Sequence, residues 1–108
     1  MSETAHVVAD GSSATDVIAR LEESARRTEV HCAGGRLVFR TWGEGRPLLL
    51  LHGGFGSWLH WVRNIGPLAE HCRVVAVDLP GLGDSDLLEG PPDGEAIAAH
   101  IVEGLVAL

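Results

Sequence analysis

The chain has 108 residues, enough for one domain, and 45% of them are hydrophobic, as in an ordinary globular protein. Its formal net charge is −7, and its 8 basic residues are all arginine, scattered apart from one adjacent pair. A nucleic-acid-binding protein would show a clustered basic patch, so this class of partner is excluded. No apolar run approaches a membrane span, and the N-terminus lacks the features of a signal peptide, so we expect a cytoplasmic protein without a membrane partner.

The cysteines and histidines show no metal-binding pattern. Cys32 and Cys72 are too few for a disulfide framework and lack the spacing of a zinc site, so we expect two buried free thiols. No two histidines are three or four residues apart, as helical metal ligands would be, and we expect neither a metal nor another cofactor. Three histidines are expected to face solvent: His60, His71 and His100.

The first 27 residues precede the strand patterns. Ser12 or Ser13 is predicted to cap a helix that continues to about Arg27, because apolar residues recur there at helical spacing. We interpret residues 1–27 as an N-terminal extension that docks through this apolar stripe, and residues 28–108 as the domain itself.

Four strands are predicted within the domain. The runs Thr28–Cys32 and Arg36–Trp42 flank a glycine pair, which is typical of an antiparallel hairpin. Four consecutive leucines predict that Leu48–His52 is a strand buried on both faces, and Cys72–Val77 is a second, nearly continuous apolar strand.

Two helices complete the pattern. One begins near Trp58 with Ser57 as its N-cap, and Gly66-Pro67 is expected to kink it or break it in two. Because it connects the two apolar strands, it predicts a right-handed βαβ unit with parallel strands, and therefore an α/β fold. The last helix follows Asp93, its predicted N-cap, and carries an apolar stripe to the end of the sequence.

Glycine-rich loops follow both apolar strands. The turn His52-Gly53-Gly54-Phe55-Gly56 brings backbone N–H groups close to whatever lies at the carboxyl end of the first strand, and a second loop begins at Asp78. One interpretation is half of a dinucleotide-binding fold, with a partial G-x-G-x-x-G and Asp78 as the ribose-binding acid. Leu59 replaces the third glycine of that pattern.

A second interpretation comes from a family resemblance. An apolar strand ending in His-Gly-Gly, a Trp-bearing helix, and a Val-rich strand ending in Asp-Leu-Pro-Gly-Leu-Gly-Asp-Ser-Asp together resemble the N-terminal half of an α/β-hydrolase fold enzyme. The resemblance covers residues 28–108. It implies the first four strands of the hydrolase sheet, in spatial order 1-2-4-3, and hydrolysis of an ester, epoxide or related bond in a small-molecule substrate.

The resemblance also implies roles for individual residues. The backbone N–H of Gly54, or of its neighbour Phe55, would form one half of an oxyanion hole. His52 and Asp78 would brace the loops. The sequence contains no Gly-x-Ser-x-Gly nucleophile elbow, and Ser85, flanked by two aspartates, is better explained as a loop serine. We therefore expect a hydrolase fragment that stops before its nucleophile and is inactive alone.

An incomplete sheet would leave the leucine strand at its edge. Natural edge strands are blunted by charge, proline or bulges, and Leu48–Leu51 has none of these. We expect poor solubility or self-association through this edge. An alternative is an interaction fragment, completed by a partner chain that adds a strand there.

Overall fold

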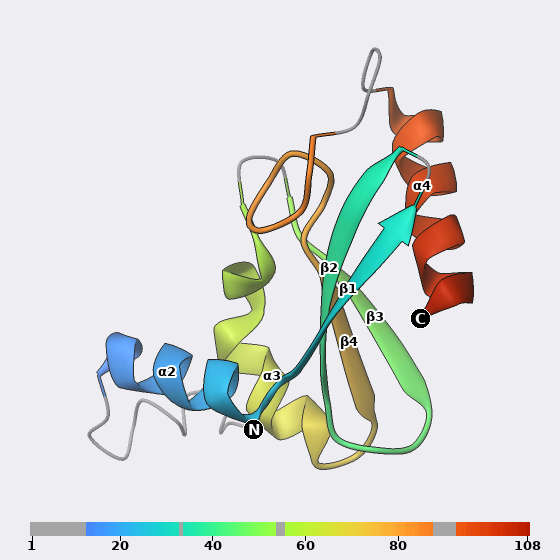
Figure 1. Cartoon of the computed structure of the whole chain (residues 1–108). Helices are drawn as coiled ribbons and strands as arrows, with labels where there is room; N and C mark the ends of the chain where they lie inside the picture. Colours follow the sequence, from blue (N-terminus) through green and yellow to red (C-terminus); the bar gives the residue numbers. More distant parts are fainter. Residues whose placement is uncertain (1–12, 33, 54–55, 88–92) are drawn as a thin grey trace.

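The structure is a computed structural model that describes residues 13–32, 34–53, 56–87 and 93–108 (Figure 1). These residues form a four-stranded sheet with helices on both of its faces. The elements in chain order are α2 (Ala14–Ser24), β1 (Arg26–Cys32), β2 (Gly35–Trp42), β3 (Pro47–Leu51), the 3-10 helix η2 (Trp58–Trp61), α3 (Val62–Ala69), β4 (Arg73–Val77) and α4 (Gly94–Ala107).

The strands lie in the order β1-β2-β4-β3, which confirms the predicted order 1-2-4-3. β1 and β2 form the antiparallel hairpin, and β2 is also antiparallel to β4. β3 runs parallel to β4, and the chain passes between them through η2 and α3. The α/β fold class is therefore confirmed. Because β3 and β4 are parallel, their carboxyl ends lie at the same end of the sheet.

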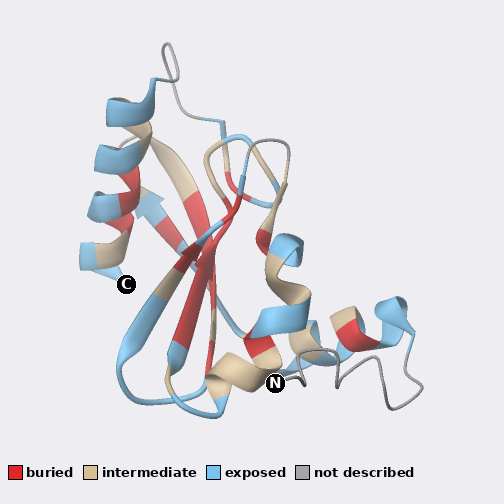
Figure 2. Cartoon of the chain, turned by 180° about the vertical axis from the view of Figure 1, so that it is seen from behind, coloured by how far each residue is buried: buried red, intermediate tan, exposed pale blue. Residues whose placement is uncertain are grey.

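Two apolar clusters, one on each face of the sheet, form the core (Figure 2). The first lies under α2, η2 and α3 and consists of Trp42, Leu50, Trp58, Ile65, Val74 and Ala76. The second, against which Leu105 of α4 packs, consists of Val30, Leu37, Phe39, Val75 and Val77. Side chains alternate between the faces along each strand, so the hairpin and the βαβ unit contribute to both clusters.

Local signals set most helix ends, and tertiary packing sets the others. Ser57 caps η2 and Asp93 caps α4, as predicted. α2 ends at Ser24, earlier than predicted, because Arg26 already pairs with β2. Of the predicted kink or break at Gly66-Pro67, the break is wrong: α3 continues through Pro67, and the change of geometry falls where η2 becomes α3. The division of the chain at residue 27 stays a prediction.

β3 is an edge strand, and its four leucines differ in burial. Leu50 belongs to the first core cluster and Leu49 is half-buried, whereas Leu48 is 37% and Leu51 is 49% exposed. The prediction of a strand buried on both faces is therefore wrong for two of the four. The reason is that β3 has β4 on one side and no strand on the other side in the described sheet.

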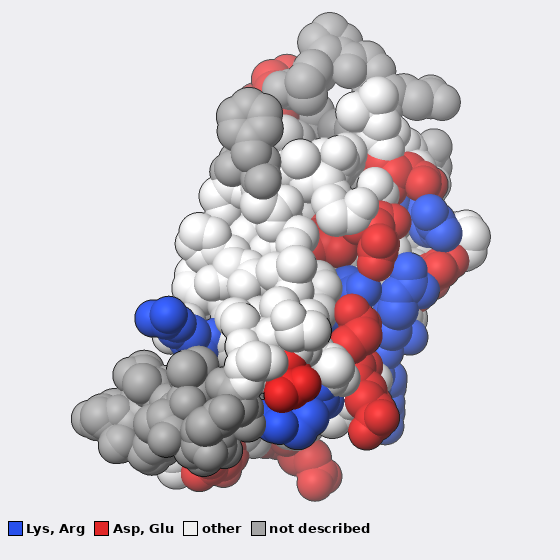
Figure 3. All heavy atoms as spheres, turned by 90° about the vertical axis from the view of Figure 1, so that its left-hand side faces the viewer, with Lys and Arg blue, Asp and Glu red and all other residues white. Residues whose placement is uncertain are grey.

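Figure 3 shows acidic and basic side chains next to one another along one side of the visible face, beside a broad area of residues without charge. Arg27 and Arg36 both pair with Glu29, and Arg36 also pairs with Asp86. The carboxylates thus neutralise these arginines locally. Within the described ranges, every helix falls short of the length and apolar character that a bilayer crossing requires.

The open edge of β3 should make the chain self-associate. Leu51→Lys places a charge at an exposed edge position, so it should lower the associated fraction measured by size-exclusion chromatography at high concentration. Leu87→Lys, which changes a leucine that is 77% exposed in the loop after β4, is the matched control and should have little effect. A wild-type chain that is monomeric at high concentration would contradict the expectation.

Gly104 lets α4 approach the sheet closely. A Cβ at this position would lie 2.8 Å from Leu37 Cδ1 and 3.1 Å from the Phe39 ring, and both side chains are fully buried. Gly104→Ala should therefore lower the free energy of unfolding by about 1–3 kcal/mol despite the better helix propensity of alanine. Gly94→Ala, in open space at the start of α4, should be neutral or stabilising by up to about 1 kcal/mol. Urea unfolding followed by circular dichroism measures both, and equal effects would contradict the close approach.

Candidate active site

The loops that follow β3 and β4 lie at the same end of the sheet, because these strands are parallel and their carboxyl ends lie side by side. The first loop contains His52, Gly53, Gly56 and Ser57, and the second comprises residues 78–87. Gly54 and Phe55, the predicted oxyanion donors, lie outside the described residues, so their role stays a prediction.

His52 connects the two loops. Its side chain is buried, and Nε2 accepts a hydrogen bond from the backbone N–H of Leu79 at 3.0 Å. Because Nε2 is an acceptor, the ring proton lies on Nδ1, which donates to the carbonyl oxygen of Gly53 at 2.7 Å. Both ring nitrogens are therefore engaged by the backbone, and neither is available to act as a general base.

Asp78 ends β4 with a carboxylate that is only 1% exposed. One oxygen accepts the backbone N–H of Trp58, the first residue of η2, at 2.8 Å. The other accepts the N–H of Asp84 at 3.0 Å and Nη1 of Arg40 at 3.2 Å. Since both oxygens serve the protein itself, Asp78 is not placed to bind a ribose, which argues against the dinucleotide-binding alternative.

The loop after β4 folds tightly over Asp78. Gly83 has φ +55°, and a Cβ there would collide with the Asp78 carboxylate, so only glycine fits. The Ser85 hydroxyl donates to the carbonyl oxygen of Asp78 at 2.6 Å and accepts the N–H of Val38 at 2.9 Å. The hydroxyl of Ser85 thus supports the loop and is buried, as expected of a structural serine.

Arg40 on β2 is a buried cation surrounded by three carboxylates. Besides Asp78, its guanidinium donates to Glu22 at 2.8 Å and to Asp84 at 2.7 Å, and it lies 5.0 Å from the centre of the Trp58 ring. The hydrogen bond from Arg40 holds the pKa of Asp84 below its usual value. Burial opposes the charge on Arg40, but hydrogen bonds to Glu22 and Asp84 raise its pKa, so it stays charged.

Sequence reasoning missed this role of Arg40. The available signal was a charge that directly follows the apolar run Leu37–Phe39 and lies within the strand, since a buried charge needs partners. A cavity of about 250 Å³ adjoins the cluster, between α2 and the two loops, and Arg40, Trp58 and Asp84 are among its lining residues. A larger hollow, about 880 Å³, lies at the other end of the strands and does not contact the loops.

Two expectations about histidine and cysteine need correction. His60 and His71 are exposed as predicted, but His100 is buried, because its side of α4 faces the sheet. Cys32 and Cys72 are free thiols, and both are half-buried rather than buried. The structure also brings three residues with metal-ligating side chains together, which spacing between histidines did not predict: Cys32, His100 and Glu103.

Removing the Arg40 charge should be strongly destabilising. Arg40→Met leaves the buried Asp78 carboxylate without its cation, so we expect the free energy of unfolding to fall by about 3–5 kcal/mol. Arg73→Met, which changes an exposed arginine at the start of β4, should alter it by less than about 0.5 kcal/mol. Thermal or urea unfolding distinguishes the variants, and similar stabilities would show that the buried ion pair is unimportant.

Known proteins resemble the part of the chain that forms this site. An epoxide hydrolase from Vigna radiata has the same fold over 79% of this chain and 28% of that one, with 30% identity and a TM-score of 0.70. A soluble epoxide hydrolase from Corynebacterium sp. (strain C12) is 51% identical over 53 residues, which are 49% of this chain and 18% of that protein. A 2-hydroxy-6-oxo-6-phenylhexa-2,4-dienoate hydrolase from Comamonas testosteroni is 37% identical over 68 residues, which are 59% of this chain and 24% of that protein.

The chain therefore spans at most about a quarter of the length of these two curated relatives. A sequence profile described as "Alpha/beta hydrolase family" matches residues 48–108, more than half of the chain, and this range includes both loops of the site. Together with the order of the strands, this match identifies the lineage: the chain belongs to the α/β hydrolase family.

Proposed function

We propose that the chain supplies the oxyanion-hole half of a hydrolase active site. The backbone N–H of Gly54, with Phe55 as the neighbouring candidate, donates to the negative charge that develops on the substrate oxygen in the tetrahedral intermediate. The observation that carries the proposal is the hydrogen-bonding of His52, which links the start of this turn to the loop after β4.

Support for this role comes from how firmly the start and end of the turn are held. An oxyanion donor stabilises charge best when its direction is set before the reaction begins. The N–H of Gly56 donates to the carbonyl oxygen of Gly53 at 3.3 Å, and Trp58 just beyond is held by the buried Asp78. His52 and Asp78 thus act as positioning residues for the turn between them.

The nucleophile, the general base and the acid of the reaction come from residues outside these 108. The substrate is a small molecule with an ester, epoxide or related electrophilic bond, a class supported by relatives that are named as an epoxide hydrolase and a dienoate hydrolase. An oxyanion hole without a nucleophile forms no covalent intermediate, so the 108-residue chain alone should be inactive.

The inactivity of the chain is directly measurable. We expect no turnover of a p-nitrophenyl ester above the rate of buffer, even at high protein concentration. Turnover that a single substitution within the chain abolishes, for instance at Ser85, would contradict the proposal, because the nucleophile would then lie among these residues.

The proposed role of the turn is tested in a longer protein. The coding sequence beyond Leu108 should be read for Gly-x-Ser-x-Gly, or the same motif with Asp in place of Ser. In the protein so encoded, His52→Ala should lower kcat about tenfold to a hundredfold with a smaller change in KM, since the donor loses its position. His71→Ala changes an exposed histidine and should leave kcat unchanged. Equal kcat values in folded variants would refute the positioning role.

A further inference from the structure

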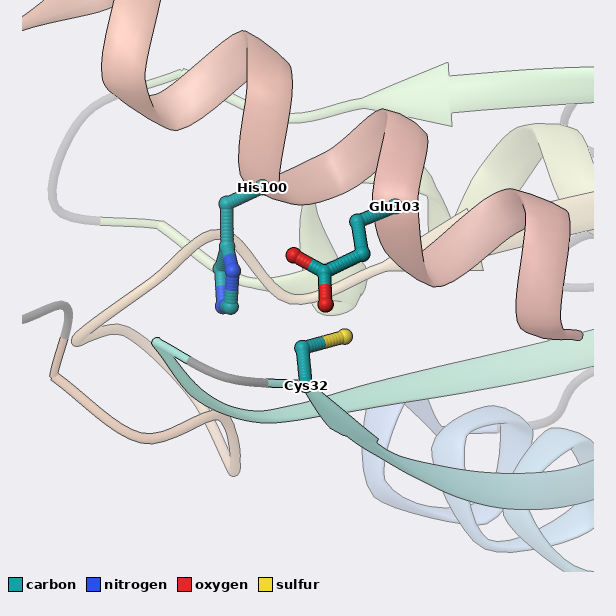
Figure 4. Close-up of side chains that lie close together, drawn as sticks. All are labelled: Cys32, His100 and Glu103. Atoms are coloured by element: carbon teal, nitrogen blue, oxygen red, sulfur yellow. The ribbon is translucent and has the colours of Figure 1, made fainter.

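Three potential metal ligands meet on the face of the sheet that α4 covers, and none of them belongs to the loops of the candidate active site (Figure 4). Cys32 is the last residue of β1, and His100 and Glu103 lie three residues apart on α4, so they share one face of the helix. The Cys32 sulfur, a ring nitrogen of His100 and a carboxylate oxygen of Glu103 all lie within 4.8 Å of one another.

The state of His100 points to a ligand. His100 is 95% buried as a residue, and its Nε2 is buried without a hydrogen-bond partner among the described residues. A buried polar nitrogen without a partner is unfavourable, and most such groups in proteins are satisfied. His52 provides the contrast within the same chain, because both of its nitrogens are engaged. Figure 4 shows the His100 ring extending from α4 toward the strand that ends in Cys32, beside the Glu103 carboxylate.

We propose that Cys32, His100 and Glu103 bind a zinc ion that links the end of β1 to α4. Sulfur, imidazole nitrogen and carboxylate oxygen are all ligands that Zn²⁺ takes, whereas Mg²⁺ and Ca²⁺ prefer oxygen alone. Three protein ligands leave a fourth tetrahedral position for water, which can enter beside the exposed Glu103.

The geometry needs only a small closure. Bonds of about 2.0–2.3 Å to zinc place neighbouring ligand atoms roughly 3.5 Å apart. Because the three ligand atoms already lie within 4.8 Å of one another, the side chains need to approach by little more than about an ångström at most. Cys32 is half-buried and Glu103 is exposed, so rotation of their side chains can supply this movement. Burial raises the pKa of the Cys32 thiol, and the negative charge of Glu103 raises it further. A bound cation offsets the unfavourable approach of the thiolate and the carboxylate.

Cobalt spectroscopy tests the site, because Co²⁺ substitutes for Zn²⁺ and reports thiolate ligation by a charge-transfer band in the near ultraviolet. One equivalent of Co²⁺ added to the tag-free chain should produce this band together with the visible bands of tetrahedral cobalt. Cys32→Ser should abolish the charge-transfer band. Cys72→Ser is the matched control, because Cys72 is also half-buried and its thiol donates to the Leu68 carbonyl; this variant should keep the band.

Zinc affinity, measured by competition with a chromophoric chelator, tests the other two ligands. Glu103→Gln and His100→Gln should each weaken binding at least about tenfold, whereas Glu70→Gln and His71→Gln, at exposed positions, should not. Circular dichroism checks that each variant is folded. Since His100 is buried, Cys32→Ser and Glu103→Gln remain decisive if His100→Gln unfolds.

The thermal midpoint gives a third measurement. Zn²⁺ should raise the Tm of the wild-type chain and of Cys72→Ser, but not of Cys32→Ser, and Mg²⁺ should raise none of them. Any of three results would overturn the proposal: no charge-transfer band in the wild-type chain, equal loss of the band in the two cysteine variants, or stabilisation by Mg²⁺ as large as that by Zn²⁺.

Discussion

The structure at the carboxyl ends of β3 and β4 depends on one constraint, the burial of the Asp78 carboxylate. A buried charge is tolerated only when its oxygens are satisfied, and here two backbone N–H groups and one guanidinium satisfy them. These donors come from η2, from the loop after β4 and from β2. One carboxylate therefore fixes three segments, and Gly83 is required because a side chain there would occupy its space.

The candidate active site follows from this constraint. Parallel pairing of β3 and β4 brings the loops that follow them to the same end of the sheet. Asp78 fixes the loop after β4 and the start of η2. His52 then joins the loop after β3 to the loop after β4. A turn anchored at both ends on a rigid sheet is the arrangement that an oxyanion donor needs, because its N–H direction must be set in advance. The charged groups around Arg40 thus serve the stability of the site, whereas the chemistry that we propose for it belongs to backbone N–H groups.

The two faces of the sheet are built differently. α2, η2 and α3 cover the face that carries Trp42 and Arg40, and η2 adds Trp58 to the apolar cluster there, whereas α4 covers the other face through the close approach at Gly104. The same approach buries His100 and brings Glu103 over the end of β1. The β3 edge, which exposes Leu48 and Leu51, is the least protected apolar surface of the described sheet.

The sequence by itself determined the α/β class and the caps at Ser57 and Asp93, because periodicity and turn residues are local signals, whereas the strand order was implied by the resemblance of the loop motifs to a known family. Only the tertiary structure decided which leucines of β3 are buried, that Arg40 lies among three carboxylates, and that His100 faces the sheet beside Cys32. These features depend on contacts between segments far apart in the chain. Spacing along one segment carries no information about how closely α4 approaches β1, or about whether a strand has a neighbour on both sides.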